Sequence, residues 1–171
     1  MTVLTTARLT LSPMTEAEWP ELCDLWSDPE FVRHIFPAGL SSEDVWTRLL
    51  RDVGHWATVG YGNWAVRLTD TGAYVGSVGI LDYRRIVDPP IDVPELGWGV
   101  APRFQGQGLA AEAVRAALAW ADSVLRAPRT VCMISPDNAP SLTLAERLGY
   151  VEYVRTTYRG DPVVLLERAA P

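Results

Sequence analysis

The sequence contains very little cysteine. Cys23 and Cys132 are the only two among 171 residues, and they lie far apart in the chain. Two cysteines are too few for the disulfide framework of a small secreted domain, and their separation does not match a zinc-binding motif. We therefore expect both to be core residues of a protein from a reducing compartment, and we expect no metal site.

Long apolar runs are missing as well. No segment approaches the ~20 consecutive apolar residues that a membrane-spanning helix needs. The first residues, Met1 to Leu4, lack the basic and apolar regions of a signal peptide. The sequence therefore predicts a cytoplasmic protein with no membrane partner.

Positive charge is in deficit. Fifteen basic and twenty-one acidic residues give a formal net charge of −6 and a pI near 4.9. Proteins that bind the phosphate backbone usually carry a basic surface, so we expect no nucleic-acid partner, whereas a cationic substrate would suit this charge. His34 and His55 are isolated and fit neither a metal-ligand spacing nor a catalytic triad, so we assign them no chemistry.

The remaining composition fits one compact domain of mixed α and β structure. The chain is 48% hydrophobic, which is enough to bury a sizeable core without metals or disulfides. It contains no repeat of fixed period, no low-complexity tract and no linker. We expect a single domain over residues 1–171.

Periodicity and turn residues predict an alternation of helices and strands. Thr15 is the expected N-cap of the first helix, Asp28-Pro29 interrupts that helix, and Ser41 or Ser42 begins the second. A turn at 69–72 joins two strands. Strands are expected at 7–11, ended by a turn at Ser12-Pro13, and at 63–68, 73–81, 93–100, 130–134, 150–157 and 163–167; helices are expected at 15–27, from 41 or 42 to Gly60, at 107–125 and from Asn138 to Gly149.

Three of these helices carry an apolar stripe at helical spacing. Opposite the stripe of the third helix, Glu112, Arg115 and Asp122 are predicted to form a solvated face. The stripes are Val45, Leu49, Val53 and Trp56; then Ala110, Ala113, Val114, Ala117, Ala121 and Val124; then Leu142, Leu144, Ala145 and Leu148.

The most informative segment runs from Glu95 to Ala111. It combines a strand, a turn that contains Gly106 and Gly108, and the start of an amphipathic helix. The first N–H groups of a helix lack intrahelical partners and lie at the positive end of its dipole. The glycines let a bulky phosphate approach the backbone closely. The sequence therefore predicts a binding site for a pyrophosphate.

Two other interpretations of this segment are weaker. Gly106, Gly108 and Ala111 also fit the G-x-G-x-x-A pattern of a dinucleotide fold, but there the first glycine follows the strand directly. Residues 101–105 intervene here, and the chain that follows is too short for a second half of such a sheet. A merely flexible turn would not need two glycines so near a helix start, because each one destabilises it.

The strand at 93–100 carries a carboxylate beside two glycines. Alternation places Glu95, Gly97 and Gly99 on one face. Glycine inside a strand often marks the close approach of a ligand or another backbone. We expect a ligand at this opening; the alternative is that the glycines accommodate the packing of Trp98.

The start of the last helix offers two polar residues. Asn138 and Ser141 border its apolar stripe, a position that suits a cleft. The alternatives are an ordinary N-cap for Asn138, with Pro140 tolerated in the first turn, and a surface hydroxyl for Ser141.

Two motifs resemble those of the GNAT superfamily of N-acetyltransferases. The segment from Arg103 to Gly108, R-x-x-G-x-G, is similar to the acyl-coenzyme A signature of that family. The segment from Asn138 to Tyr150, N-x-x-S followed by L-G-Y, is similar to the branch that includes the ribosomal-protein-alanine acetyltransferases. The resemblance implies an α+β domain with a mixed, mostly antiparallel sheet flanked by helices, and acetyl-coenzyme A (acetyl-CoA) as the acyl donor.

The resemblance also implies how acetyl-CoA is held. In this family a central strand splays from its neighbour, and its exposed backbone groups bind the thioester arm. The residues expected to contact acetyl-CoA are Trp98, Gly99, Val100, Arg103, Gln105, Gly106, Gln107, Gly108, Leu109, Ala110, Asn138 and Ser141.

Acetyl transfer to an amine needs a neutral amine, a polarised carbonyl and a protonated sulfur leaving group. Glu95 is the candidate base, acting directly or through water, and a backbone N–H of Trp98–Val100 would polarise the carbonyl. Ser141 is the candidate acid. A common family pattern has tyrosine seven residues beyond the asparagine, where this chain has Ala145, so Ser141 or Tyr150 would substitute for it.

Several functions and acceptors stay open at this level. The main hypothesis is an N-acetyltransferase that acts on a primary amine; a non-catalytic acyl-CoA-binding regulator and a dinucleotide-dependent oxidoreductase are the alternatives. The acceptor is a protein N-terminus, a lysine, a polyamine, an aminoglycoside or a small metabolite, and a homodimer could complete its pocket. In the resembled family the N-terminal helices overlie the acceptor, so aromatic residues there suggest an apolar or aromatic acceptor: Trp26, Phe31, Phe36 and Trp46.

Overall fold

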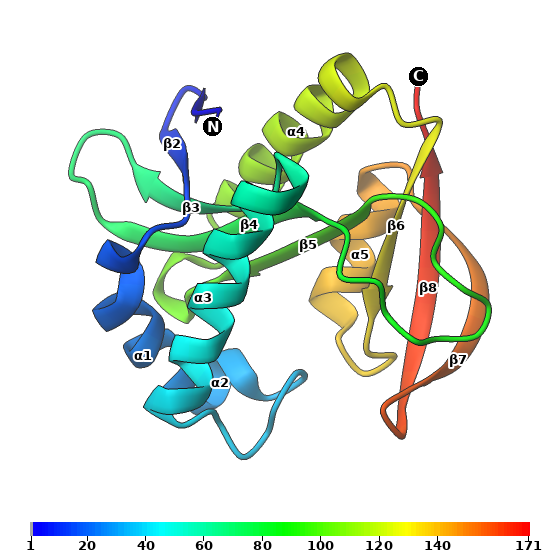
Figure 1. Ribbon diagram of the computed structural model, residues 1–171, viewed down its shortest axis with the longest axis horizontal. Helices are drawn as coiled ribbons and strands as arrows, with labels where there is room; N and C mark the ends of the chain where they lie inside the picture. Colours follow the sequence, from blue (N-terminus) through cyan, green and yellow to red (C-terminus); the bar gives the residue numbers. More distant parts are fainter. Residues whose placement is uncertain (1) are drawn as a thin grey trace.

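The centre of the molecule is one twisted sheet, seen in the computed structural model, which describes residues 2–171 (Figure 1). Over these residues the strand order is β1-β2-β3-β4-β5-β6-β8-β7, and every neighbouring pair is antiparallel except β5 and β6. The predicted mixed, mostly antiparallel sheet is confirmed, and a doubly wound dinucleotide fold is excluded. The strands are β1 Leu4–Thr5, β2 Leu9–Pro13, β3 Asn63–Leu68, β4 Tyr74–Leu81, β5 Glu95–Val100, β6 Arg129–Ile134, β7 Val151–Tyr158 and β8 Asp161–Ala169.

Helices cover both faces of this sheet. The N-terminal helices α1 to α3 lie on one face, and α4 and α5 lie on the other (Figure 1). The α-helices are α1 Trp19–Ser27, α2 Pro29–Val32, α3 Ser42–Val59, α4 Leu109–Trp120 and α5 Ala139–Arg147; short 3₁₀ turns lie at Glu16–Glu18 and Pro102–Phe104, and a π-helical turn at Ala121–Leu125 follows α4. None of the helices described in residues 2–171 is long and apolar enough to cross a membrane.

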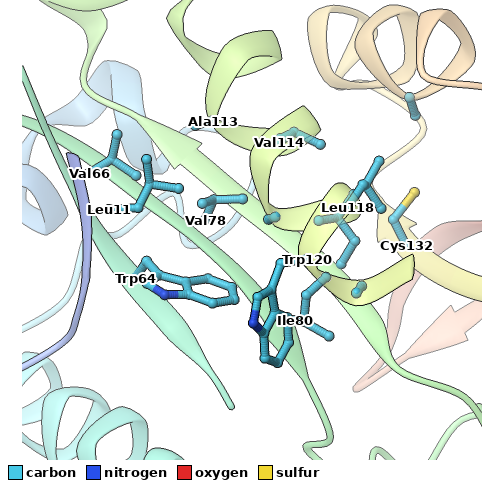
Figure 2. Packing of buried hydrophobic residues seen from close by; sticks show 14 of the residues in the cluster. Leu11, Trp64, Val66, Val78, Ile80, Ala113, Val114, Leu118, Trp120 and Cys132 are labelled. Carbon is cyan, nitrogen blue, oxygen red and sulfur yellow. The ribbon is translucent and has the colours of Figure 1, made fainter. Parts of the chain in front are cut away.

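The larger hydrophobic core lies between the sheet and α4 (Figure 2). Trp64 of β3 contacts Trp56 of α3 and Trp120 of α4 edge to face, with ring centroids 5.1 and 5.3 Å apart. Cys132 is fully buried in this core, as predicted, whereas Cys23 is only half-buried at the smaller core under α1 and α3.

Two predicted core residues are exposed in the structure. Val53 of α3 is 37% exposed, because the buried stripe continues through Asp52, whose carboxylate is paired. Val124 is 58% exposed, since α4 ends at Trp120 and the π-helical turn that follows breaks the helical spacing. Both errors arise from extending a regular period over a position where tertiary contacts or local geometry change it.

Three local predictions also need correction. Ser12-Pro13 is not a turn but the end of β2, and Pro13 lies beyond the first residue of β1, where a missing N–H is tolerated. Thr15 caps a 3₁₀ turn, and the α-helix itself begins only at Trp19. Glu112 and Asp122 are half-buried in ion pairs rather than solvated, whereas Arg115 is exposed as expected.

The start of α3 is stabilised by a capping box. The Ser41 hydroxyl accepts the Asp44 N–H at 3.1 Å, and the Asp44 carboxylate accepts the Ser41 N–H at 3.3 Å. We expect Ser41→Ala to lower the free energy of unfolding by about 1 kcal/mol, measured by urea denaturation. Ser42→Ala, one residue further on, should change it by less than about 0.5 kcal/mol. Equal losses in the two variants would contradict the cap.

Candidate active site

The two central strands part beyond a single pair of residues. β5 and β6 are parallel and pair only at Glu95 and Val131 (Figure 1). The Pro94 carbonyl accepts the Val131 N–H at 3.1 Å, and past this bond β6 diverges from β5. The splayed strand that the resemblance implied is therefore present in the fold.

The parting leaves backbone groups of β5 without a strand partner. Ala101 donates its N–H to Val75 in β4 at 2.8 Å, whereas Pro94 faces β6. Because alternate residues of a strand direct their backbone groups to opposite neighbours, Trp98 and Val100 direct theirs toward the missing β6 partner. The opening therefore lies at the edge of β5 and presents free N–H groups there.

The glycine loop joins β5 to α4 in a conformation that favours glycine. Gly106 and Gly108 have φ of +73° and +76°, and a Cβ at Gly106 would meet no atom within 4 Å. Backbone conformation rather than crowding therefore requires glycine there. Within the described chain, the N–H groups of 106–108 make no backbone hydrogen bond, and the first bond of α4 joins Glu112 to Gly108. Free donors thus gather at the positive helix end, as an anion site needs.

An arginine that sequence analysis placed only in a strand lies beside this loop. Arg8 donates from Nη1 to the Gln107 carbonyl at 3.0 Å and pairs with the Glu112 carboxylate at 2.6 Å. Hydrogen bonds from Thr6 and Arg8 lower the pKa of Glu112. No sequence signal connects positions about a hundred residues apart, so this contact could not be predicted.

The polar side chains of the predicted acetyl-CoA segment contact nearby backbone. Gln105 donates from Nε2 to the Val100 carbonyl at 3.1 Å, at the free edge of β5. Arg103 is exposed and donates to the Tyr74 carbonyl at 3.3 Å, and Gln107 donates to the Arg103 carbonyl at 3.1 Å. These bonds hold the loop in place and leave its N–H groups free.

The glycine face of β5 is closely packed by neighbouring side chains. A Cβ at Gly99 would lie 2.9 Å from the Phe31 ring of α2, and one at Gly97 would lie 3.2 Å from Leu81. Trp98 packs against the larger core instead. The close packing of Phe31 and Leu81 therefore requires glycine at these positions, and the packing of Trp98 does not; both glycines also line the pocket described below. Farther along, Leu109 is buried in the core and Ala110 is half-buried, so Leu109 anchors α4.

Asn138 and Ser141 lie at the same end of the sheet as the glycine loop, because each follows the carboxyl end of one of two parallel strands. Asn138 is the N-cap of α5 and accepts the Ser141 N–H at 3.2 Å. The Ser141 hydroxyl is half-buried and makes no hydrogen bond within residues 2–171. The N-cap alternative for Asn138 is thus observed, and Ser141 keeps a free hydroxyl.

Tyr150, the other candidate acid, lies in the hydrophobic core. Its side chain is 2% exposed, and its hydroxyl contacts the Thr130 hydroxyl at 2.6 Å inside the core. Burial raises the pKa of Tyr150. The structure therefore removes Tyr150 as a substitute acid, because no ligand can reach its hydroxyl.

Glu95 begins β5 at the point where the strands part. Glu95 is 5% exposed, and its carboxylate is held by the Arg85 guanidinium through two bonds of 2.6 and 2.8 Å. Arg85 also donates to the Tyr158 hydroxyl at 3.3 Å. Burial acts to lower the pKa of Arg85, but the bonds to Glu95 and Tyr158 outweigh it and the pKa rises. Arg85 lies in the loop after β4, and nothing in the sequence indicated this ion pair.

A pocket of about 160 Å³ lies between the N-terminal helices and strands β3 to β5. Trp26 and Phe31 line it as predicted, whereas Phe36 packs on Arg48 and Trp46 packs on Trp19, 4.9 Å between ring centroids. Its apolar wall comprises Met14, Leu22, Trp26, Phe31, Ile35, Val45, Leu49 and Leu81; its polar groups are Arg48, Arg51, Asp52, Asn63, Ser77 and Tyr83; β5 contributes Gly97, Trp98 and Gly99.

One polar network in this pocket is internally satisfied. The buried Asp52 carboxylate accepts the Tyr83 hydroxyl at 2.6 Å, Asn63 at 3.0 Å and Arg51 at 3.0 Å. Burial and the Asp52 charge raise the pKa of Tyr83. These partners occupy the Asp52 carboxylate, so it is not available to a ligand cation. No sequence pattern indicated this network.

Neither histidine lines this pocket. His55 bonds the Tyr61 carbonyl through Nδ1 and accepts the Asp82 N–H through Nε2 at 2.9 Å, which defines a neutral tautomer. His55 therefore has a structural role in holding the turn after α3. Across residues 2–171, no three His, Cys, Asp or Glu side chains are grouped so as to hold a metal ion.

Comparisons with known proteins agree with this architecture. The family model described as an acetyltransferase (GNAT) domain matches residues 8–151. A Bordetella pertussis structure assigned to the GNAT acetyltransferases is 35% identical, with TM-score 0.87 over 99% of this chain and all of that one. The uncharacterized N-acetyltransferase p20 of Bacillus licheniformis is 24% identical over 88% of this chain and 83% of its own. The ribosomal L7/L12 alpha-N-protein acetyltransferase RimL, solved with coenzyme A, shares the fold at 17% identity, TM-score 0.78 and 98% coverage of both chains.

Proposed function

Because the chain belongs to the GNAT acetyltransferase family, we propose that it binds acetyl-CoA and transfers the acetyl group directly to a primary amine. The observation that carries this proposal is the free backbone edge of β5 beside the glycine loop. One end of the site offers N–H donors at a helix start, and the other offers strand donors next to a pocket. That combination suits a long ligand with an anionic end and a reactive end.

The site residues fit acetyl-CoA in type and position. Acetyl-CoA supplies an acetyl thioester on a long arm that ends in a pyrophosphate. The N–H groups of 106–108 and the first turn of α4 would bind the pyrophosphate, and the arm would pair with the free edge of β5. The N–H of Trp98 or Val100 would donate to the carbonyl oxygen, whose negative charge grows during transfer.

In this proposal Glu95 takes up the proton of the acceptor amine. An amine with a pKa near 10 is charged at neutral pH and must lose that proton before it attacks. Each Glu95 oxygen receives one bond from Arg85, which leaves further lone pairs for a water that relays the proton. Arg85 orients the carboxylate and compensates its buried charge.

Ser141 is proposed to donate to the departing sulfur or to orient a water that does so. We expect Ser141→Ala to lower kcat about tenfold or more, with little change in the affinity for coenzyme A. Tyr150→Phe is the matched control: it should leave kcat unchanged and lower the free energy of unfolding by about 1–3 kcal/mol, since the Thr130 hydroxyl loses its partner. A Tyr150→Phe variant that loses turnover and keeps its stability would reverse this assignment.

The decisive experiment measures the release of free thiol from acetyl-CoA with a panel of amines and N-terminal peptides. All fifteen basic residues are arginines, so no lysine of the chain itself can accept the acetyl group. Release that depends on the added amine would establish the transferase. Tight binding of acetyl-CoA without release for any amine would instead establish the binding-only regulator. A cytoplasmic location belongs to the same proposal and is supported by the free cysteines. A homodimer belongs to it as well, because a second copy could complete the acceptor pocket.

A further inference from the structure

Arg48 is a cation without an anion beside it. It lies on α3, and its guanidinium packs on the rings of Trp26 and Phe36, with Cζ 4.6 Å from each ring centroid. Within residues 2–171 it makes no hydrogen bond and has no carboxylate within 4.0 Å. Its side chain is half-buried and lines the pocket between the N-terminal helices and the sheet.

The other charges around this pocket are already paired. Arg51 binds Asp52 at 3.0 Å, and Arg85 binds Glu95 at 2.6 Å. Each pair is neutral as a unit, so Arg48 leaves the pocket with one net positive charge. A pocket of this kind attracts a single negative charge from its ligand.

The environment of Arg48 affects its charge. Burial, followed by the charge of Arg51, lowers the pKa of Arg48 to about 10. The group is still protonated at neutral pH, and its N–H donors have no protein acceptor within residues 2–171, so they are available to a ligand. The guanidinium is a planar fork, which can donate two parallel hydrogen bonds to one carboxylate.

We propose that the acceptor carries a carboxylate that binds the guanidinium of Arg48; this rests on the proposed acetyl transfer. The carboxylate is a monoanion that matches the single net charge and accepts two bonds from a guanidinium. The pocket volume also suits a small acceptor, because an engineered cavity of roughly 150 Å³ holds one benzene molecule. Its wall is mostly apolar, and Gly97 and Gly99 bring β5 to its side. The acceptor class is thus a free amino acid with an apolar side chain, its amine directed to β5.

Matched acceptors test this class. L-leucine, L-leucinamide and 3-methylbutylamine share one apolar body and an amine, but only leucine carries the carboxylate; L-phenylalanine and 2-phenylethylamine form a second pair. We expect kcat/KM for the amino acid to exceed that for each neutral partner by about tenfold or more. Equal values within each set in the native protein would overturn the inference, even where transfer itself is observed.

Variants assign the preference to Arg48. Arg48→Met should raise KM for leucine about 10- to 100-fold and abolish the preference over 3-methylbutylamine, with kcat little changed. Arg48→Lys should retain part of this preference, because lysine keeps the positive charge but lacks the planar guanidinium. Arg147→Met, on the exposed face of α5, is the control and should change nothing. Loss of kcat on charged and neutral acceptors alike would mean a structural role for Arg48.

A binding measurement separates this inference from the proposed function. N-acetyl-L-leucine has the carboxylate but no amine to acetylate, so calorimetric titration reports the site without any transfer. Binding that Arg48→Met weakens tenfold would support the site even if no amine releases thiol. No binding by the native protein, or equal binding by both, would overturn it. O-phosphoethanolamine carries an amine and a phosphate in place of the carboxylate. A higher kcat/KM for it than for leucine would show that Arg48 binds a phosphate rather than a carboxylate of the acceptor.

Discussion

Gly106→Val is expected to weaken the binding of coenzyme A by more than about 100-fold, a loss of ~2.7 kcal/mol or more. Two physical effects add. Valine resists the φ of +73° that Gly106 adopts, so the loop rearranges and its N–H groups no longer converge. Its side chain also points into the open space next to the loop, where a phosphate would lie. Calorimetric titration with coenzyme A measures the loss directly.

Gly72 offers a matched control for this substitution. It has the same φ of +73°, and a Cβ there also meets nothing within 4 Å, but it lies in the turn between β3 and β4. Gly72→Val should therefore lower the free energy of unfolding by a similar amount, at least ~1–2 kcal/mol, and leave coenzyme A binding unchanged. If the two variants lose coenzyme A affinity equally, the effect is one of general stability and the loop is not the phosphate site.

Glu95→Gln is the second substitution with a large expected effect. It should lower kcat/KM for the amine acceptor about 10²- to 10⁴-fold, because glutamine accepts a hydrogen bond but cannot take up the amine proton. The affinity for coenzyme A should stay within about threefold, since that affinity depends on the glycine loop and the β5 edge. Raising the pH should partly rescue the variant, because a larger fraction of the amine is then neutral without a base.

The Glu95→Gln substitution also removes the ion-pair partner of Arg85. Removing the Glu95 charge leaves a buried guanidinium uncompensated, which in other proteins destabilises by about 3–5 kcal/mol. The double variant Glu95→Gln with Arg85→Met removes both charges and should recover most of the stability while turnover stays low. Recovery of turnover together with stability would show that Glu95 only neutralises Arg85, and the base would have to be sought elsewhere.

Local sequence patterns predicted most of the framework. The hairpin of β3 and β4, the Thr15 and Ser41 caps and the helix stop at Gly149 follow from interactions within a few residues. The glycine loop was predictable for the same reason, because its positive φ and the following helix start are local features. Val53 and Val124 were misplaced where the local period was extended past a change that tertiary contacts impose.

The sequence by itself determined the order of elements, the glycine loop and the family, because backbone conformation and motif spacing depend on neighbouring residues. Only the tertiary structure decided which charges meet. The contacts of Arg85 with Glu95, of Arg8 with Glu112, and of Arg48 with Trp26 and Phe36 each join separate elements. It also buries Tyr150 in the core and leaves the Ser141 hydroxyl without a hydrogen-bond partner in residues 2–171. The physical reason is that a side chain's partner depends on how distant segments pack, whereas periodicity reports only which face of its own element the residue occupies.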